Sequence, residues 1–300
     1  MSVIASTGHG GLPTIELSVQ HKSSHVICYL HGATLAAYTR NNIPYIFMSE
    51  KAIYNGVKAL RGGVPLVFPQ FGQPNPTMPQ HGILRTSSEW KLSKSIVHSE
   101  ESVSAVLSLE SSEATRSLWP YSFIAELTIE LNTKALKYSL LITNTDSQIF
   151  ECQALLHTYI RIPSIHDIKI HGLHGLPFMD KLTSETANEM KSEFTFSSEV
   201  DRIYKGNLSS SCLTVSVGDR ELLHTTRSAY KMSPSGDTVP LPCDVVVWNP
   251  WIQKATDLTD LGVESYPLFV CLEPGTVSQM VSLEPNEKLC IQQDLVPNDS

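Results

Sequence analysis

Apolar and polar residues alternate along much of this chain, and this period of two constrains its fold more than any other feature. From 123 to 131 every odd position is apolar, while Glu126 and Glu130 lie among the even ones. Residues 103–109 and 136–142 alternate in the same way. Because successive side chains of a strand point to opposite faces, this pattern predicts strands with one covered face.

Two other segments, 244–248 and 268–272, are unbroken apolar runs. Such runs are typical of strands that are covered on both faces. Helix candidates are few, namely residues 111–118 and one or two turns around 254–261. The sequence therefore predicts an all-β fold, a large antiparallel β-sandwich with few short helices.

We expect residues 1–300 to form one β-sandwich domain, because no internal repeat, low-complexity tract or Pro/Gly-rich linker divides the chain. Residues 1–12 are expected to be a flexible N-terminal tail. The chain is 41% hydrophobic and 17% charged, which is enough apolar material for an extensive core.

The net charge of −8 argues against nucleic acid as a partner, since binding to a phosphate backbone requires a surplus of Lys and Arg. No apolar stretch approaches the ~20 residues that span a bilayer. The first residues lack the basic start and apolar run of a signal peptide. We therefore expect a cytoplasmic protein without a nucleic-acid or membrane partner, and a monomer, since nothing marks an exposed apolar edge.

The six cysteines are scattered and form no CxxC pair, so the sequence offers neither a zinc knuckle nor a dithiol motif. Five of them have apolar neighbours, as expected for reduced, buried thiols. A GxSxG elbow, an HExxH motif and a P-loop are also absent from the sequence. We expect no metal and no cofactor.

The segment from Arg61 to Arg85 is rich in Gly, Pro, Gln and His, and its prolines exclude a continuous central strand. Near its end, Gln80 and His81 can make directional hydrogen bonds, and Arg85 can hold an oxyanion with two parallel donors. This segment predicts recognition of a small polar ligand that carries a negative charge. A polar loop that only covers the sandwich is the alternative.

Two further segments carry candidates for proton transfer. If 154–162 is one strand, His157, Tyr159 and Arg161 share a face, which lines either a solvated surface or a binding cleft. Glu273 follows the apolar run 268–272, and partial desolvation there would make it a better base. Trp248 is expected in the core.

Six motifs resemble, in order and spacing, those of the hexose-6-phosphate mutarotases of the aldose 1-epimerase superfamily. They are RGGVPLVFPQFG at 61–72, MPQHGILR at 78–85, LLHTYIRI at 155–162, DRIY at 201–204, WNPW with KATDLTDLG at 248–262 and CLEPG at 271–275. The resemblance implies a β-sandwich enzyme that interconverts the α and β anomers of an aldose without redox chemistry or a metal.

The resemblance also implies roles for single residues. Glu273 would be the base for the C1 hydroxyl, and His157 the acid for the ring oxygen. Glu273 is then expected to be ionised, and His157 protonated or readily so, because a carboxylate favours the charged imidazole. The substrate contacts implied by the family are Arg61 and Arg85 for the phosphate and Gln80, His81 and Asp201 for the sugar.

Two alternatives stay open at this point. A mutarotase for free aldoses would keep His157 and Glu273 but would not need both arginines. A sugar-phosphate-binding protein without catalysis would need neither an acid nor a base. The expected partner in the first interpretation is a small-molecule sugar phosphate, with glucose 6-phosphate foremost.

Overall fold

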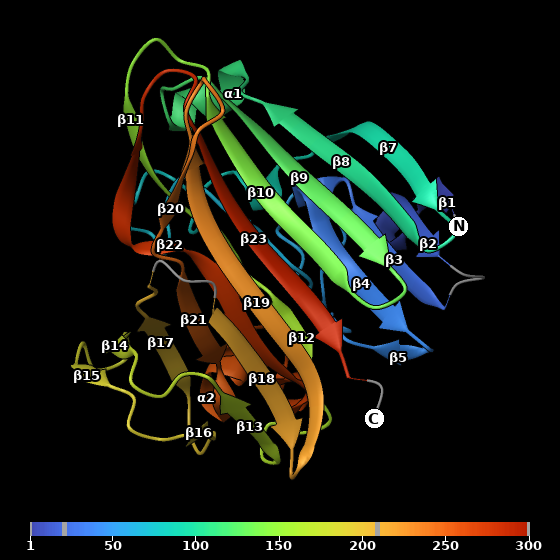
Figure 1. Cartoon of the computed structure of the whole chain (residues 1–300), viewed down its shortest axis with the longest axis vertical. Helices are drawn as coiled ribbons and strands as arrows, with labels where there is room; N and C mark the ends of the chain where they lie inside the picture. Colours follow the sequence, from blue (N-terminus) through green and yellow to red (C-terminus); the bar gives the residue numbers. More distant parts are fainter. Residues whose placement is uncertain (1, 20–22, 208–210, 299–300) are drawn as a thin grey trace.

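The architecture is a layered stack of antiparallel sheets (Figure 1). A computed structural model describes residues 2–19, 23–207 and 211–298. Every pair of strands in the described part of the chain is antiparallel. The strands are β1 (Ser2–Thr7), β2 (Pro13–Val19), β3 (Ser24–Tyr29), β4 (Thr34–Arg40), β5 (Ile43–Pro44), β6 (Leu66–Val67), β7 (Lys91–Ser99), β8 (Ser102–Glu110), β9 (Phe123–Asn132), β10 (Leu136–Asn144), β11 (Phe150–Leu156), β12 (Tyr159–Arg161), β13 (Ile168–His171), β14 (Pro177–Asp180), β15 (Thr186–Asn188), β16 (Glu193–Phe194), β17 (Val200–Tyr204), β18 (Ser211–Val217), β19 (Arg220–Met232), β20 (Thr238–Leu241), β21 (Asp244–Asn249), β22 (Phe269–Leu283) and β23 (Lys288–Pro297).

Three sheets make up the stack. A ten-stranded sheet has the order β16-β13-β18-β19-β23-β10-β9-β8-β7, with β20 beside β19. A five-stranded sheet runs from β1 to β5 in chain order, and its strands β1, β2 and β3 contact β7, β8 and β9. An eight-stranded sheet has the order β15-β14-β17-β21-β22-β11-β6, with β12 beside β22, and it contacts β19 and β23. The ten-stranded sheet thus packs against both smaller ones, and the main core lies between them.

The predicted strands are confirmed where the period of two was clear. In β9 and β10, buried positions alternate with more exposed ones, as expected for strands with one covered face. The apolar runs lie in β21 and at the start of β22, where Val245, Val246, Val247 and residues 269–272 are almost fully buried. Both faces of these strands are covered, as predicted.

Helices are short and few in the described residues. The α-helices are α1 (Glu113–Leu118) and α2 (Trp251–Asp257), and the 3-10 helices are η1 (His9–Gly11), η3 (His31–Ala33), η4 (Leu84–Thr86) and η5 (Val263–Leu268). Helix α1 begins at a capping box, in which Ser112 and Thr115 bond each other's backbone N–H groups. None of the described helices is long and apolar enough to cross a bilayer.

The expected flexible tail at the N-terminus is wrong. Residues 2–7 form strand β1, which pairs with β2 along its whole length, from Ser2 opposite Ser18 to Thr7 opposite Pro13. The turn that follows is held by the Gly8 N–H, which donates to the Leu12 carbonyl at 2.9 Å. A lone edge strand with few buried side chains carries a weak sequence pattern, because backbone hydrogen bonds rather than apolar burial hold it.

Candidate functional site

A polar hollow of about 140 Å³ opens on the eight-stranded sheet, on the face away from the ten-stranded sheet. All seven residues that the sequence singled out line it. They are Arg61, Gln80, His81, Arg85, His157, Asp201 and Glu273. The structure therefore brings together side chains from five separate parts of the chain.

The register of four strands explains why the floor of the hollow is polar. Asp201 of β17 lies opposite Trp248 of β21, Trp248 lies opposite Cys271 of β22, and Cys271 lies opposite Tyr159 of β12. Residues in one row share a face, and so does Glu273, two positions beyond Cys271. The neighbours of these residues along β21 and β22 point to the other face and belong to the main core.

His157 occupies a break in its strand rather than a strand position. The predicted continuous strand over 154–162 is wrong, because β11 ends at Leu156 and β12 begins at Tyr159. At the break, the Thr158 hydroxyl donates to Gln293 Oε1 at 2.6 Å in the core. The His157 N–H donates to the Pro65 carbonyl at 3.0 Å. These bonds fix the kink and direct the imidazole into the hollow.

The neighbours of His157 hold its ring in one orientation. The imidazole stacks on Tyr159 with a centroid distance of 5.0 Å and an interplanar angle of 14°. The rings of Trp248 and His81 meet it edge-on. Trp248 is half-buried: it packs against the core, as expected, and it also lines the hollow, because it faces the same side as Asp201. Arg161 is exposed and does not line the hollow.

His157 and Glu273 form a buried pair. Nδ1 of His157 lies 3.3 Å from Oε1 of Glu273, and the two side chains are 11% and 1% exposed. The two atoms lack the geometry of a hydrogen bond, and within the described residues neither they nor Oε2 of Glu273 have a hydrogen-bond partner. Buried polar atoms are nearly always paired, so this carboxylate and imidazole are arranged to bond something else.

Burial opposes a charge on either member of the pair. It raises the pKa of Glu273 well above its usual value, and Asp201 adds to this, whereas Lys181 and Arg85 act in the opposite sense. Burial also lowers the pKa of His157, and so do the nearby arginines. The expected pair of an ionised Glu273 and a protonated His157 is therefore disfavoured, because desolvation outweighs their mutual attraction.

His81 presents a hydrogen-bond donor to the hollow. The backbone N–H of Gly72 donates to His81 Nδ1 at 3.2 Å, so the neutral ring carries its proton on Nε2. Burial, followed by the charge of Arg85, lowers the pKa of His81 and keeps it neutral. The backbone of His81 has φ of 64°, and the next residue, Gly82, has φ of 79° with no room for a Cβ beside the Phe68 carbonyl.

Two arginines lie together at one side of the hollow but differ in their bonding. Arg61 donates from Nε to Asp260 at 3.0 Å and from Nη1 to the Tyr159 hydroxyl at 3.4 Å. Burial opposes its charge, but Tyr159 and Asp260 outweigh burial and raise its pKa. Arg85 donates from Nη2 to the Gln80 carbonyl at 2.8 Å, while its buried Nε has no partner in the described part of the chain. Burial and the charge of Arg61 lower the pKa of Arg85 to about 10.

The same two arginines also line a second hollow of about 410 Å³. The two hollows also share His157. The arginines therefore lie at the junction between the acid–base pair and a space open enough for an anionic substituent.

Lys181 is a site residue that sequence reasoning missed. It lies in the turn after β14, and Nζ is 3.2 Å from Oδ2 of Asp201 and 4.6 Å from the centroid of the Phe71 ring. Phe71, Lys254 and Leu258 were missed as well, and all three line the hollow. A single lysine in a polar turn carries no pattern that distinguishes it from a surface residue.

The sequence matches a known protein family over most of its length. Residues 15–294 match the family model described as Aldose 1-epimerase. The chain belongs to the aldose 1-epimerase family. It is an isomerase that exchanges the anomers of a sugar, and a polar hollow with an acid–base pair is consistent with that chemistry.

Members of this family with similar sequences come from plants and bacteria. A protein from Cenchrus ciliaris is 30% identical over 87% of this chain and 77% of its own length. One from Escherichia coli K12 is 26% identical over 89% of this chain and 82% of its own. Both carry the provisional name glucose-6-phosphate 1-epimerase.

Solved structures show the same fold. The crystal structure of a provisionally assigned mutarotase, YeaD from Salmonella typhimurium, has a TM-score of 0.80 at 21% identity, covering 99% of this chain and 97% of that one. The structure of HI1317 has a TM-score of 0.74 at 23% identity, covering 98% and 100%. The predicted mutarotase-like β-sandwich is thus confirmed.

A metal ion has one possible set of ligands in the described residues, and it lies at the polar hollow. Ligand atoms of His157, Cys271 and Glu273 all lie within 4.8 Å of one another. Burial raises the pKa of the Cys271 thiol, which opposes the thiolate that a metal needs. The positive charges of Arg85 and Lys181 also disfavour a cation there. The chemistry of the lining thus does not favour a metal ion.

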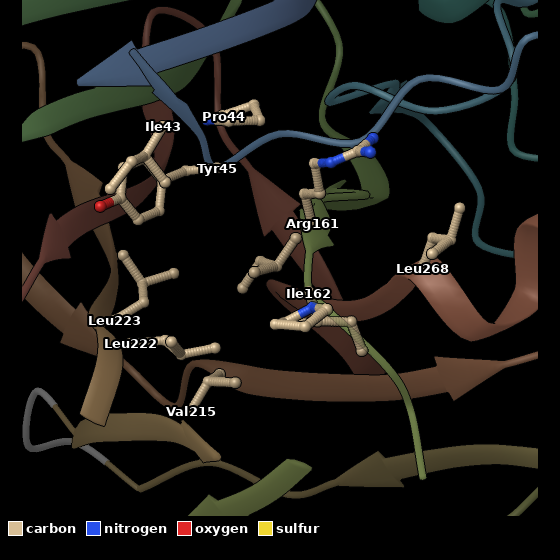
Figure 2. Close-up of a pocket in the computed structure, with 11 residues that line it drawn as sticks. Ile43, Pro44, Tyr45, Arg161, Ile162, Val215, Leu222, Leu223 and Leu268 are labelled. Carbon is tan, nitrogen blue, oxygen red and sulfur yellow. The ribbon is translucent and has the colours of Figure 1, made fainter. Parts of the chain in front are cut away.

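A separate cavity of about 270 Å³ lies on the other side of β12. Figure 2 shows its apolar lining, with Tyr45, Ile162, Val215 and Leu223 around it. Arg161, predicted to share a face with His157, lies here. The lining contains no acid or imidazole, so this cavity cannot carry the proton transfers of an epimerase.

Proposed function

We propose that this aldose 1-epimerase interconverts the α and β anomers of hexose 6-phosphates, with glucose 6-phosphate as the foremost substrate. One observation carries the proposal: an unpaired carboxylate and imidazole share a hollow with two arginines. The pair suits proton transfer at C1 and O5, and the arginines suit a phosphate. The names of the plant and bacterial relatives agree with this substrate.

The two proton transfers are assigned to the buried pair. Glu273 takes the proton from the C1 hydroxyl, and the C1–O5 bond breaks as His157 donates a proton to O5. The aldehyde formed rotates about C1–C2, and the ring closes when the two transfers run in reverse on its other face. Protons and electrons balance, because one proton enters the sugar as another leaves. Each positioned group contributes about 10²–10⁴-fold to the rate.

Phosphate is the natural complement of the arginine pair. A guanidinium donates two parallel hydrogen bonds to a phosphate, and the free Nε of Arg85 is available for such contacts. Arg61 donates from Nε to Asp260 and from Nη1 to Tyr159, which leaves its Nη2 for the ligand. A sugar without phosphate would leave Arg85 without this partner, so the site would bind such a sugar more weakly.

A bound phosphate would also favour His157 as an acid. The positive charges of Arg85 and Arg61 lower the pKa of His157, and a dianion beside them offsets both. The imidazole can then gain the proton that it must donate. Binding of the correct substrate thus helps to create the charged form that burial otherwise disfavours.

The remaining contacts concern the sugar itself. His81 donates from Nε2 near the reacting centre, and Asp201 accepts from a ring hydroxyl. Gln80 lies exposed at the rim, where it can contact a substituent of the ring. We also infer that the chain acts as one domain, because one buried cluster runs from Ile15 to Leu295.

Saturation-transfer NMR tests the proposal, because it measures α/β exchange at equilibrium for each sugar alone. We expect acceleration of glucose 6-phosphate exchange and little acceleration for free glucose. Equal acceleration of both would identify a mutarotase for free aldoses. Binding of glucose 6-phosphate without acceleration would identify a non-catalytic sugar-phosphate-binding protein.

A further inference from the structure

Lys181 reaches the epimerase site from a turn that is itself fixed. Asp180, the residue before it, accepts hydrogen bonds from Arg202 Nε at 2.9 Å and from the Leu182 N–H at 3.0 Å. The Lys181 N–H donates to the Asp201 carbonyl at 2.8 Å. The backbone of Lys181 is therefore tied to β17, the strand that carries Asp201.

The ammonium group of Lys181 has two contacts of its own. Its Nζ bonds Asp201 Oδ2 at 3.2 Å and lies over the Phe71 ring at 4.6 Å. Its side chain is 31% exposed, so most of it is covered. A lysine with a carboxylate partner, an aromatic platform and an anchored turn has a defined position at the mouth of the hollow.

Several titratable groups face Glu273 from the elements around it. The groups from other elements are Arg61, Arg85, Lys254, His81, His157 and Asp201. On its own strand lies Cys271, and opposite that residue lies Tyr159. Burial raises the pKa of both Cys271 and Tyr159, so both stay neutral at ordinary pH.

Among these groups, the charge of Lys181 has a distinct role. Arg61 is paired with Asp260, and Arg85 is the group that we assign to the substrate's phosphate. Lys181 is not assigned to the phosphate, and its charge opposes the effect of burial on the Glu273 carboxyl. Asp201 acts in the opposite sense on Glu273, and the ion pair of Lys181 with Asp201 weakens that action.

We propose that Lys181 is a positioning residue that keeps Glu273 ionised as the base of the reaction and holds Asp201 in place for the sugar. This inference rests on the proposed function, since it assigns Lys181 to the same proton transfers. Lys181 touches neither the C1 hydroxyl nor the ring oxygen in this scheme. It acts through the two carboxylates.

The pH dependence of kcat/KM for glucose 6-phosphate in three variants tests this role. Lys181→Met removes the charge but keeps most of the length of the side chain, so both limbs of the profile should move to higher pH by about one unit, because the pKa values of Glu273 and His157 both rise. Lys181→Arg keeps the charge and should keep the pH profile of the wild type. Asp201→Asn should move only the limb that Glu273 controls, and to lower pH, because it removes a charge that raises the Glu273 pKa.

A purely structural role for Lys181 would lower kcat or raise KM without moving either limb of the pH profile, and that result would overturn the inference.

NMR titration of His157 gives a readout that does not depend on activity, with the signal assigned by its loss in His157→Gln. The charge of Lys181 lowers the pKa of His157, so Lys181→Met should raise it. If the wild type accelerates no hexose phosphate, the proposed function fails, and an unchanged His157 titration then overturns the role of Lys181 separately.

Discussion

Nδ1 of His157 and Oε1 of Glu273 lie 3.3 Å apart at the floor of the hollow, and neither atom has a hydrogen bond to the described residues. Strand β22 carries Glu273, and His157 lies at the break between β11 and β12, which both pair with β22 and place the two side chains across from each other. An unpaired buried carboxylate costs stability, so its burial is explained by function rather than by folding.

Replacement of Glu273 by Gln should therefore stabilise the protein. Burial raises the Glu273 pKa in the folded state, so its contribution to stability is present below the usual value of 4.5 and is lost as pH rises through the folded value. We expect Glu273→Gln to exceed the wild type by about 1–3 kcal/mol at pH 8 and by less near pH 4. Urea unfolding at both pH values measures this. A variant less stable than the wild type at pH 8 would contradict it.

Replacement of Arg85 by Met should weaken binding of the phosphorylated sugar alone. A hydrogen bond to a charged group contributes about 1.5–3 kcal/mol, so KM for glucose 6-phosphate should rise about 10–150-fold. Exchange of free glucose should change far less. Arg116→Met, at an exposed position of α1, is the matched control. Equal losses for both sugars would mean that Arg85 supports the fold rather than the phosphate.

The His157 pKa should rise when glucose 6-phosphate binds. The charges of Arg85 and Arg61 lower it, and the phosphate dianion offsets them. NMR titration of the imidazole should show the rise with glucose 6-phosphate but not with free glucose. Exposed His98 serves as the internal reference. In Arg85→Met, the His157 pKa should start higher and rise less, and an unchanged value would refute this coupling.

The sequence predicted the fold well because the strands that form it have strong patterns. The alternation in β9 and β10 and the apolar runs of β21 and β22 correspond to side chains that are buried on one face or on both. Strand β1 was missed because edge pairing needs little apolar burial. A period of two reports burial, and it does not report backbone pairing.

The site residues were found from motifs, but their arrangement was not. The break at Thr158 depends on its hydrogen bond to Gln293, which lies far away in the sequence. Neither the position of Lys181 beside Asp201 nor that of Trp248 over the hollow follows from local pattern. Burial also reverses the charges expected for the His157–Glu273 pair, and burial of this kind depends on tertiary contacts.

The rate of α/β exchange of glucose 6-phosphate, measured by saturation-transfer NMR with wild-type protein and Glu273→Gln, tests the central claim most directly. The claim is that the buried pair of Glu273 and His157 transfers the protons. We predict exchange well above the uncatalysed rate for the wild type and a loss of about 10²–10⁴-fold in the variant. Exchange at the wild-type rate by a folded Glu273→Gln protein would contradict it.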